Sequence, residues 1–359
     1  MIPVNKIFLP PIEEYTNILS KAWDYGQITN QGKLLLKLES DLKKYLNIDN
    51  IQFVSNGTVS LQLAIRALDL SGSDSEIITT PFSYVATISS ILWEGCKPVF
   101  VDIESNNFCI DVSKIEEKIT SKTKAIMAVH VFGYVCDIEK IKSISDKYNL
   151  KVIYDAAHAF GVEYKGKSIF CYGDISSCSF HATKLFHTVE GGACFTNNKN
   201  LDDKINLIKK FGHVNDDHYC LGINTKNSEF HAAMGLINLK YISEIISERK
   251  KISNTYDLLL NKTIIRPKYQ ENTSYNYSYY PIVFESENDL KKNLLDLNKN
   301  DIFPRRYFYP SLNKLSYLKD YFECQNSESI ASRIMCLPLY CGLKEVDLER
   351  ISRIINNNI

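Results

Sequence analysis

The sequence predicts an α/β protein whose larger part is built on a mostly parallel sheet. Short runs rich in β-branched or apolar residues alternate with amphipathic segments such as Thr58–Leu70, where Leu61, Ile65 and Leu68 recur at helical spacing. The short runs are also nearly continuously apolar, which is typical of parallel strands covered by helices on both faces. The predicted strands are Glu76–Thr80, Lys97–Asp102, Lys124–Val131, Lys151–Asp155, Ser176–Phe180 and Gly192–Thr196.

Beyond the last of these runs the pattern changes, which predicts a second, smaller α+β domain. Helical segments dominate first, and one of them, Ser228–Lys250, is long enough to bridge two domains. A strand-like run, Tyr279–Phe284, and a helix over Asp289–Leu297 follow. We therefore expect a large domain over residues 1–245 and a small one over 246–359. The N-terminal ~30 residues are expected near the small domain or the functional site.

The charge balance and the hydropathy of the chain give no support for a nucleic acid or a membrane as its partner. Among the 359 residues, 42 are Lys or Arg and 42 are Asp or Glu, so the formal net charge is zero. This removes the simplest argument for a nucleic acid or an anionic membrane as partner. The longest apolar stretch, Ala125–Val135, carries His130 and is too short to span a bilayer. The N-terminus lacks the apolar core and cleavage site of a signal peptide.

The cysteines predict reduced thiols in a cytoplasmic protein. The chain has ten cysteines, scattered without C-x-x-C pairs. A disulfide framework or a zinc site needs tighter, repeated spacing, so we expect neither a disulfide nor a metal.

One lysine, Lys184, is the first candidate for a catalytic residue. It ends the segment Ser179–Lys184 on a short loop between two predicted strands, and Glu190-Gly191-Gly192 follows. Lysine is the side chain that condenses with aldehydes. Most loop lysines are only solvated charges, so the interpretation depends on the other features along the chain.

Two of these features lie near the start of the predicted sheet. Ser55-Asn56-Gly57-Thr58 opens a helix, and an N-cap followed by glycine leaves free backbone N–H groups that bind phosphate. A plain capped helix is the more common meaning of such a segment. Tyr84 follows a predicted strand, where an aromatic ring can stack on a flat cofactor. A core or surface tyrosine is the alternative.

Two further features lie at a strand end and ahead of the long helix. Asp155 ends the apolar run Lys151–Asp155, and ligands in α/β sheets bind outside the carboxyl ends of strands. A carboxylate there can pair with a protonated pyridine nitrogen, although a turn cap is equally common. His158 follows three residues later. Asn224, by itself, is more often a turn residue than a ligand contact.

Together these features match the needs of pyridoxal 5′-phosphate (PLP). They supply a phosphate cradle, a ring to stack on, a partner for the pyridine nitrogen and an amine that condenses with the aldehyde. The spacing alone does not establish this cofactor.

The order of the motifs resembles the DegT/StrS-type sugar aminotransferases. That family has the aspartate aminotransferase (type I) fold, which implies a large PLP-binding domain with a mostly parallel seven-stranded sheet and a smaller α+β C-terminal domain. The likeness runs over most of the chain. Its motifs are Asn56-Gly57-Thr58, Pro81 to Thr87, Asp155-Ala156-Ala157-His158, Ser179 to Lys184, Glu190-Gly191-Gly192 and Phe303-Pro304-Arg305-Arg306-Tyr307.

The resemblance implies a role for each residue around the cofactor ring. Lys184 would hold PLP covalently and then move the proton as general base and acid. Asp155 would bind the pyridine nitrogen, His158 would lie near the ring hydroxyl, and Tyr84 would stack on the ring. Some relatives have histidine in place of the lysine and act as dehydratases, so Lys184 favours transamination.

It also implies how the phosphate and the substrates are bound. The backbone amides of Gly57 and Thr58 and the hydroxyl of Ser179 would hold the phosphate. Asn224 would reach the phosphate in the neighbouring subunit, which makes the active enzyme a homodimer with shared sites. The substrate-binding residues would be His181, Arg305 and Tyr309.

Within the family, His181-Ala182 resembles the nucleotide-sugar 4-aminotransferases, because the 3-aminotransferases more often have Tyr-Pro there. The implied reaction moves the amino group of L-glutamate to C4 of a nucleotide-linked 4-keto-6-deoxyhexose, for cell-surface polysaccharide synthesis. A 3-aminotransferase is the alternative, and a non-catalytic sensor or scaffold of the same fold is a further one. His187 stands where many relatives have a small polar residue, and the resemblance assigns it no role.

One apparent nucleotide motif is rejected. Residues 161–168 match G-x-x-x-x-G-K-[ST], but that loop must follow a strand and open a helix. Here a turn at Lys165-Gly166 predicts a hairpin instead. No G-x-G-x-x-G is present, so a dinucleotide-dependent oxidoreductase has no support.

Overall fold

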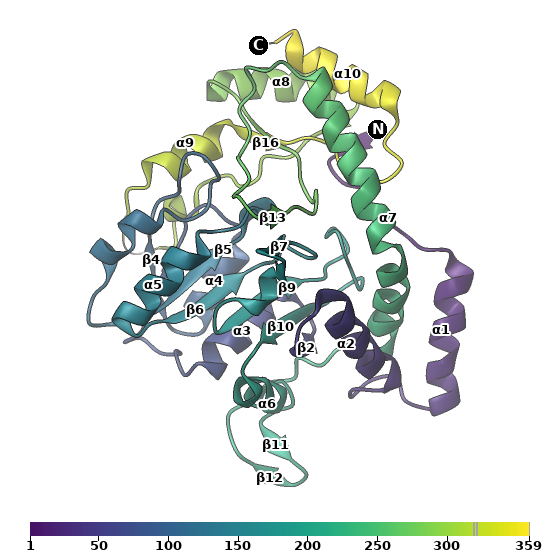
Figure 1. The fold of residues 1–359 in the computed structure, drawn as a ribbon, viewed down its shortest axis with the longest axis vertical. Helices are drawn as coiled ribbons and strands as arrows, with labels where there is room; N and C mark the ends of the chain where they lie inside the picture. Colours follow the sequence, from purple (N-terminus) through teal and green to yellow (C-terminus); the bar gives the residue numbers. More distant parts are fainter. Residues whose placement is uncertain (319, 321, 359) are drawn as a thin grey trace.

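The computed structural model describes residues 1–318, 320 and 322–358 (Figure 1). A seven-stranded sheet with helices on both faces forms the larger part of the molecule. The long helix α7 runs along one side of the molecule towards α8 and α10 (Figure 1). The helices are α1 (Ile12–Tyr25), α2 (Lys33–Leu46), α3 (Gly57–Ala67), α4 (Ala86–Trp93), α5 (Ile138–Tyr148), α6 (Lys199–Ile208), α7 (Glu229–Leu259), α8 (Glu287–Lys299), α9 (Gln325–Arg333) and α10 (Glu345–Asn356).

The main sheet has the strand order β2-β10-β9-β6-β5-β3-β4. Only β10 runs antiparallel to its neighbours, β2 and β9, and the other pairs are parallel. The predicted α/β class with a mostly parallel sheet is therefore confirmed. Its strands are β2 (Asn50–Val54), β3 (Glu76–Thr79), β4 (Lys97–Phe100), β5 (Thr123–Val129), β6 (Lys151–Asp155), β9 (Ile175–Ser179) and β10 (Gly192–Thr196).

The apolar strands are buried on both faces because successive side chains point to opposite sides of a sheet. In β6, Ile153 packs into a core cluster with residues of α3, α4 and α6. Its neighbours Val152 and Tyr154 pack into a second cluster, which includes residues of α2, α5 and α7. This arrangement explains why β6 is apolar on both faces between its terminal residues Lys151 and Asp155.

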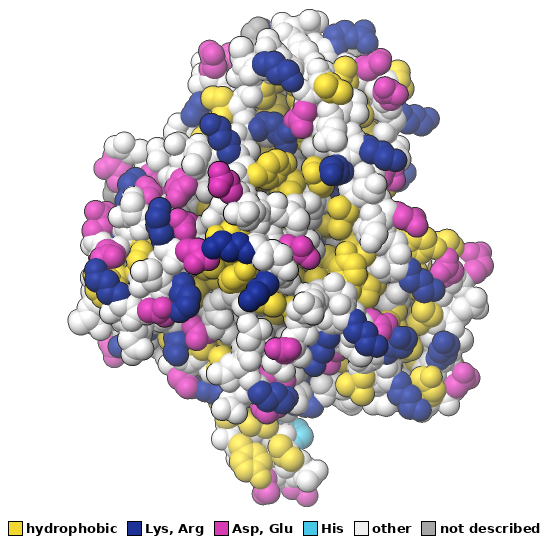
Figure 2. Space-filling model, in the orientation of Figure 1, with side chains coloured by type: hydrophobic (Ala, Val, Ile, Leu, Met, Phe, Trp, Pro, Cys, Tyr) yellow, Lys and Arg dark blue, Asp and Glu magenta, His cyan; other side chains and the backbone are white. Residues whose placement is uncertain are grey.

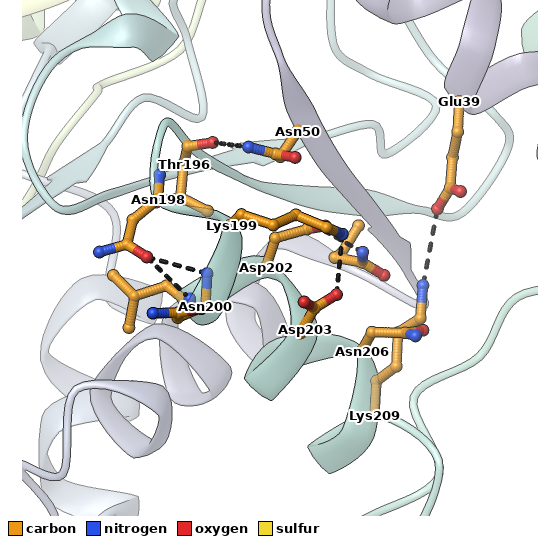
Figure 3. Close-up of polar contacts among 12 residues, drawn as sticks. Glu39, Asn50, Thr196, Asn198, Lys199, Asn200, Asp202, Asp203, Asn206 and Lys209 are labelled. Carbon is orange, nitrogen blue, oxygen red and sulfur yellow. Dashed lines mark hydrogen bonds and ion pairs between the residues drawn. The ribbon is translucent and has the colours of Figure 1, made fainter.

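Strand β2 lies outside the runs that the sequence predicts as strands. Its sequence alternates polar and apolar residues, although all of it is buried. Asn50 donates to the carbonyl oxygen of Thr196 at 3.0 Å, and the amide nitrogen of Gln52 donates to Asp202 at 2.6 Å. Polar side chains with such partners are tolerated in a core, and Figure 3 shows the Asn50 contact. The polar residues therefore concealed from sequence analysis an edge strand of the main sheet, whose polar side chains find hydrogen-bond partners only in the folded chain.

The rejected nucleotide motif forms the predicted hairpin. Strands β7 (Glu163–Tyr164) and β8 (Lys167–Ser168) pair antiparallel, and Lys165 and Gly166 both have positive φ, of 50° and 71°. Positive φ at both central residues is typical of a tight hairpin turn. No α-helix begins there, and only the three-residue 3-10 helix Ile169–Cys171 follows, so the segment lacks the geometry of a phosphate loop.

The C-terminal part has its own apolar cluster, which packs α8, α10 and the end of α7 against β14 (Pro281–Val283) and β16 (Ile334–Cys336). The proposed division after residue 245 falls inside α7. At the N-terminus, β1 (Ile2–Pro3) pairs with β15 (Ile302–Phe303), and α1 packs on α7. The small remaining strands are β11 (His213–Val214), β12 (Asp217–His218) and β13 (Thr273–Ser274).

A buried ion pair joins α2, β2 and the end of α6. The Lys209 side chain is 1% exposed, and its Nζ lies 3.5 Å from Oε1 of Glu39. Nζ also donates to the carbonyl oxygen of Phe53, while the same Glu39 oxygen accepts the Phe53 N–H at 2.8 Å. Figure 3 shows the two side chains approaching each other from α2 and from the end of α6. Burial lowers the pKa of Lys209, and the Glu39 carboxylate opposes that shift.

Replacing Lys209 with methionine should destabilise the protein by about 3–5 kcal/mol, because Glu39 would remain buried without a cation. The double variant Glu39→Gln/Lys209→Met should lose less, since no uncompensated charge is left. The free energy of unfolding, measured by denaturant titration of both variants, tests this. A double variant as unstable as the single one, or worse, would show that the pair itself supplies the stability.

Candidate functional site

The carboxyl ends of β2, β3, β6 and β9 meet at one edge of the sheet, where the antiparallel β10 begins. A cavity of about 620 Å³ opens there. Ligands of α/β sheets bind at this edge. The predicted site residues that line the cavity are Gly57, Thr58, Tyr84, Asp155, His158, Ser179, His181, Lys184 and Arg305. Asn224 and Tyr309 are not among the lining residues.

The start of α3 forms an anion-binding corner of this cavity. Asn56 caps the helix, since its Oδ1 accepts the Val59 N–H at 2.9 Å. The first N–H groups of a helix have no acceptor inside it, and they carry the positive end of the helix dipole. A Cβ added at Gly57 would lie 2.8 Å from the Cβ of Ser179. Only glycine therefore lets the Ser179 side chain approach the helix terminus this closely.

Asp155 lies at the carboxyl end of β6 and is only 6% exposed. Its Oδ2 accepts the Thr87 hydroxyl at 2.7 Å, and its Oδ1 accepts the Ala157 N–H at 3.1 Å. Burial raises the pKa of Asp155, while these two donors and the charge of Lys184 act in the opposite direction. The carboxylate is thus held in a dry environment, where pairing with a cation is strongest.

His158 is held as a neutral ring at the floor of the cavity. Its Nδ1 accepts the Phe132 N–H at 3.1 Å, so the hydrogen of the neutral ring is on Nε2. Burial, helped by the positive charge of Lys184, lowers the pKa of His158 well below its usual range. The ring also lies parallel to that of Phe308, with centroids 5.6 Å apart. His158 can therefore donate one hydrogen bond without carrying a charge.

Lys184 lies on the loop between β9 and β10, and its backbone N–H donates to the carbonyl oxygen of His181 at 2.8 Å. Burial lowers the pKa of Lys184, and the charge of Asp155 is the largest opposing effect. A lowered pKa increases the fraction of neutral amine, which is the nucleophilic and basic form. The site therefore favours the form of lysine that can react.

His187 has a structural explanation although it does not line the cavity. Its Nε2 lies 2.7 Å from the carbonyl oxygen of Phe8, and Asn238 of α7 donates to its backbone oxygen at 2.8 Å. Nearby, Asn5 donates to the carbonyl oxygen of Thr183 at 2.7 Å. These contacts fasten the N-terminal segment and α7 to the loop that carries Lys184.

Of the three residues predicted to bind substrate, His181 and Arg305 line the cavity and Tyr309 does not. The Nδ1 of His181 accepts the Thr183 N–H, and its Nε2 lies 3.6 Å from a carboxylate oxygen of Glu190. Arg305 is exposed at the cavity, with its guanidinium 4.8 Å from the ring centroid of Tyr307.

Tyr309 is not brought to the cavity. Its ring lies 3.6 Å from the Arg306 guanidinium, which pairs with Glu287.

Tyr84 lines the cavity, whereas Asn224 does not. The Tyr84 ring lines the cavity and is 53% exposed, so a face is free to contact a ligand. Asn224 follows the β11–β12 hairpin, is exposed, and accepts a hydrogen bond from Lys226 Nζ at 2.8 Å. It does not contact the cavity of its own chain.

Several residues of the site escape the sequence reasoning. Thr87 contacts Asp155 directly and stands three positions after Tyr84, in the first turn of α4. That spacing places both near the same strand end, which is a usable signal. Tyr279 and Tyr307 line the cavity from the C-terminal part. Tyr307 belongs to the motif Phe303–Tyr307, whereas nothing in the sequence distinguishes Tyr279 among 22 tyrosines.

Within residues 1–318, 320 and 322–358, no group of three or more His, Cys, Asp or Glu side chains is arranged to hold a metal ion. Over the same described ranges, no helix has the length and apolarity needed to cross a membrane.

Comparison with known proteins gives consistent matches over the whole chain. The chain is 42% identical to a dTDP-4-amino-4,6-dideoxy-D-glucose transaminase of Shigella dysenteriae, with 96% of this chain and 95% of that one covered. An Escherichia coli protein of the same name is 38% identical, with 99% and 98% covered. The structure also matches Helicobacter pylori PseC, an aminotransferase involved in the biosynthesis of pseudoaminic acid, with a TM-score of 0.92 and 26% identity over 99% of this chain and 98% of that one.

These findings confirm the predicted fold class, the aspartate aminotransferase (type I) fold of PLP enzymes. They also confirm that the chain is a sugar aminotransferase. The family model of the DegT/DnrJ/EryC1/StrS aminotransferases matches residues 12–356. The chain therefore belongs to the DegT/DnrJ/EryC1/StrS aminotransferase family.

Proposed function

We propose that this protein is a PLP-dependent aminotransferase that moves the amino group of L-glutamate to C4 of a nucleotide-linked 4-keto-6-deoxyhexose, dTDP-4-keto-6-deoxyglucose. The observation that carries the proposal is that Lys184 and Asp155 line one cavity beside the start of α3. The names of the Shigella and Escherichia relatives support the choice of sugar and of carbon.

The residues present fit PLP in both shape and chemistry. The N-terminus of α3 and the Ser179 hydroxyl suit a phosphate, and the missing Cβ of Gly57 leaves room for their close approach. Asp155 suits a protonated ring nitrogen, and the neutral Nε2–H of His158 suits a ring oxygen. The exposed Tyr84 face suits an aromatic ring.

When bound, PLP supplies a ring that withdraws electrons from the reacting carbon. The neutral amine of Lys184 would remove a proton from the donor carbon in the first half of the reaction and would deliver a proton to the sugar carbon in the second half. A negative charge on Asp155 would pair with the ring nitrogen and favour the electron-withdrawing form. Arg305 adds positive charge for the substrate anions, and His181 donates or accepts for sugar hydroxyls.

The stoichiometry of the reaction tests this proposal. The purified protein, incubated with PLP, L-glutamate and dTDP-4-keto-6-deoxyglucose, should form one 2-oxoglutarate for each keto-sugar consumed. Enzymatic determination of 2-oxoglutarate alongside chromatography of the nucleotide sugar measures both. Glutamate consumption without loss of the keto-sugar, or no consumption at all, would reject the proposed substrate pair.

We also propose a homodimer in which Asn224 completes the phosphate site of the neighbouring subunit. The β11–β12 hairpin stands out from the body of the molecule (Figure 1). Figure 2 shows apolar side chains gathered on this protrusion. An exposed apolar group of this kind is typical of a protein contact surface. The exposed large apolar residues of the segment are Phe211, Val214, Tyr219, Leu221 and Ile223.

Subunit mixing tests the shared site. Lys184→Ala and Asn224→Ala homodimers should both be impaired at limiting PLP. A heterodimer has one site with an intact lysine and an intact asparagine from its neighbour, so mixing with reassociation should restore about a quarter of wild-type activity. Activity of the mixture equal to the mean of the two variants would contradict the shared site.

A cytoplasmic location completes the proposal. Ten cysteines are present in the described residues, and all of them are free thiols. Thiols persist in reducing compartments, which supports the cytoplasm. The product would there supply an amino sugar for cell-surface polysaccharide.

A further inference from the structure

Three side chains form a hydrogen-bonded chain that ends on Asp155. The hydroxyls of Ser83 and Thr87 lie 2.7 Å apart, and the Thr87 hydroxyl lies 2.7 Å from Oδ2 of Asp155. Thr87 is fully buried and Ser83 is 2% exposed, yet Ser83 lines the cavity. The chain thus leads from the cavity wall to the carboxylate through a space closed to bulk water.

The direction of these hydrogen bonds follows from counting hydrogens. An ionised carboxylate only accepts, and each hydroxyl has a single hydrogen. Thr87 must therefore donate to Asp155, and Ser83 must donate to Thr87. The hydrogen bond that Thr87 accepts from Ser83 polarises the Thr87 hydroxyl, and this strengthens the hydrogen bond that Thr87 donates to Asp155. The chain has this single direction only while Asp155 is ionised.

We propose that Thr87, supported by Ser83, is a positioning residue that keeps the buried Asp155 ionised and fixes its Oδ2. This inference rests on the proposed function, in which Asp155 pairs with the ring nitrogen of PLP. Oδ1 is held separately by the Ala157 N–H. Both carboxylate oxygens then have a fixed orientation before any ligand binds, which is the preorganisation that a charge pair needs.

The charged and titratable groups around Asp155 set the direction of the expected effect. Lys184 faces it from the β9–β10 loop, Cys178 from β9, and His158 follows it in the chain. Burial raises the pKa of Asp155, and the Thr87 hydroxyl is the largest effect that lowers it. Without that hydroxyl the pKa rises further, so the carboxylate is lost at a higher pH as the solution is acidified.

Thr87→Val removes the hydroxyl and keeps the shape of the side chain. Titration of the apoprotein with PLP, followed by absorbance across the acidic and neutral range, measures the dissociation constant. We expect the dissociation constant of Thr87→Val to rise about tenfold near neutral pH. The pH at which affinity is half lost should move up by about one unit relative to wild type. Thr87→Ser should restore both values to within about twofold.

Ser83→Ala provides a second test, because it leaves Thr87 in place and should shift both values in the same direction by less. Denaturant midpoints of the apoproteins report whether the variants remain folded. Superimposed pH profiles of wild type and Thr87→Val, or a serine variant as weak as the valine one, would overturn the proposal. Wild-type protein that binds no PLP would instead overturn the proposed function itself, so the two failures are distinguishable.

Discussion

Lys184→Ala should abolish transamination, with a loss of at least about 10⁴-fold in kcat, because one residue supplies both the condensing amine and the acid–base group. Lys184 lines the same cavity as Asp155, Tyr84 and Tyr307, and desolvation lowers its pKa. The fraction of neutral, reactive amine therefore rises as pH increases through that lowered pKa. Single-turnover kinetics with glutamate, followed in the visible absorbance of the PLP-loaded enzyme, measures the loss.

A suitable control is Lys165→Ala. That lysine lies in the β7–β8 turn and pairs with Glu139 at 2.8 Å on the surface. It should retain wild-type turnover and spectrum. A Lys184→Ala protein with an unchanged spectrum that glutamate still bleaches would contradict the role of Lys184.

Asp155→Asn has the second largest expected effect. The amide keeps the size of the side chain and can still accept from Thr87, but it carries no charge to pair with a protonated ring nitrogen. Removing one partner of a buried charge pair costs about 2–5 kcal/mol, which predicts a loss of about 30- to 5,000-fold in kcat/KM for glutamate. Steady-state kinetics at saturating PLP measures this loss separately from weaker cofactor binding.

Asp174→Asn is the matched control, because this carboxylate lies near the other end of the same strand. Its Oδ2 accepts the Val152 N–H at 2.7 Å, so it serves β6 structurally and lies outside the cavity. The Asp174→Asn substitution should lower the free energy of unfolding and leave kcat nearly unchanged. If Asp155→Asn retained full catalytic efficiency, the pairing of Asp155 with the ring nitrogen would be wrong.

The sequence predicts those elements of the fold that have a regular pattern of apolar residues. Continuous apolar runs such as Lys151–Asp155 are strands, since burial on both faces leaves no polar side. Asp155 stands out because a carboxylate ends such a run. β2 could not be recognised, because its polar residues are buried against partners far along the chain, such as Thr196 and Asp202.

Lys184 and the start of α3 could be selected as site candidates from the sequence because single residue types there carry the chemistry, and their roles stay predictions. Residues that act through tertiary contacts could not be selected in this way. His187 meets Phe8, 179 positions away in sequence, and Thr87 meets Asp155 across 68 positions. Tyr309 lies four positions after Arg305, yet its ring contacts Arg306 and does not line the cavity. Proximity in sequence does not fix the direction of a side chain on an irregular segment.

The most direct test of the proposed 4-aminotransferase activity is to determine which carbon of the sugar receives the nitrogen. Nitrogen-15-labelled glutamate and dTDP-4-keto-6-deoxyglucose, incubated with the PLP-loaded enzyme, give a product whose proton–nitrogen correlations locate the label by NMR. The account predicts an amino group on C4 of the hexose. It would be contradicted if the 4-keto sugar acquired no label while the 3-keto isomer was converted to a product labelled on C3.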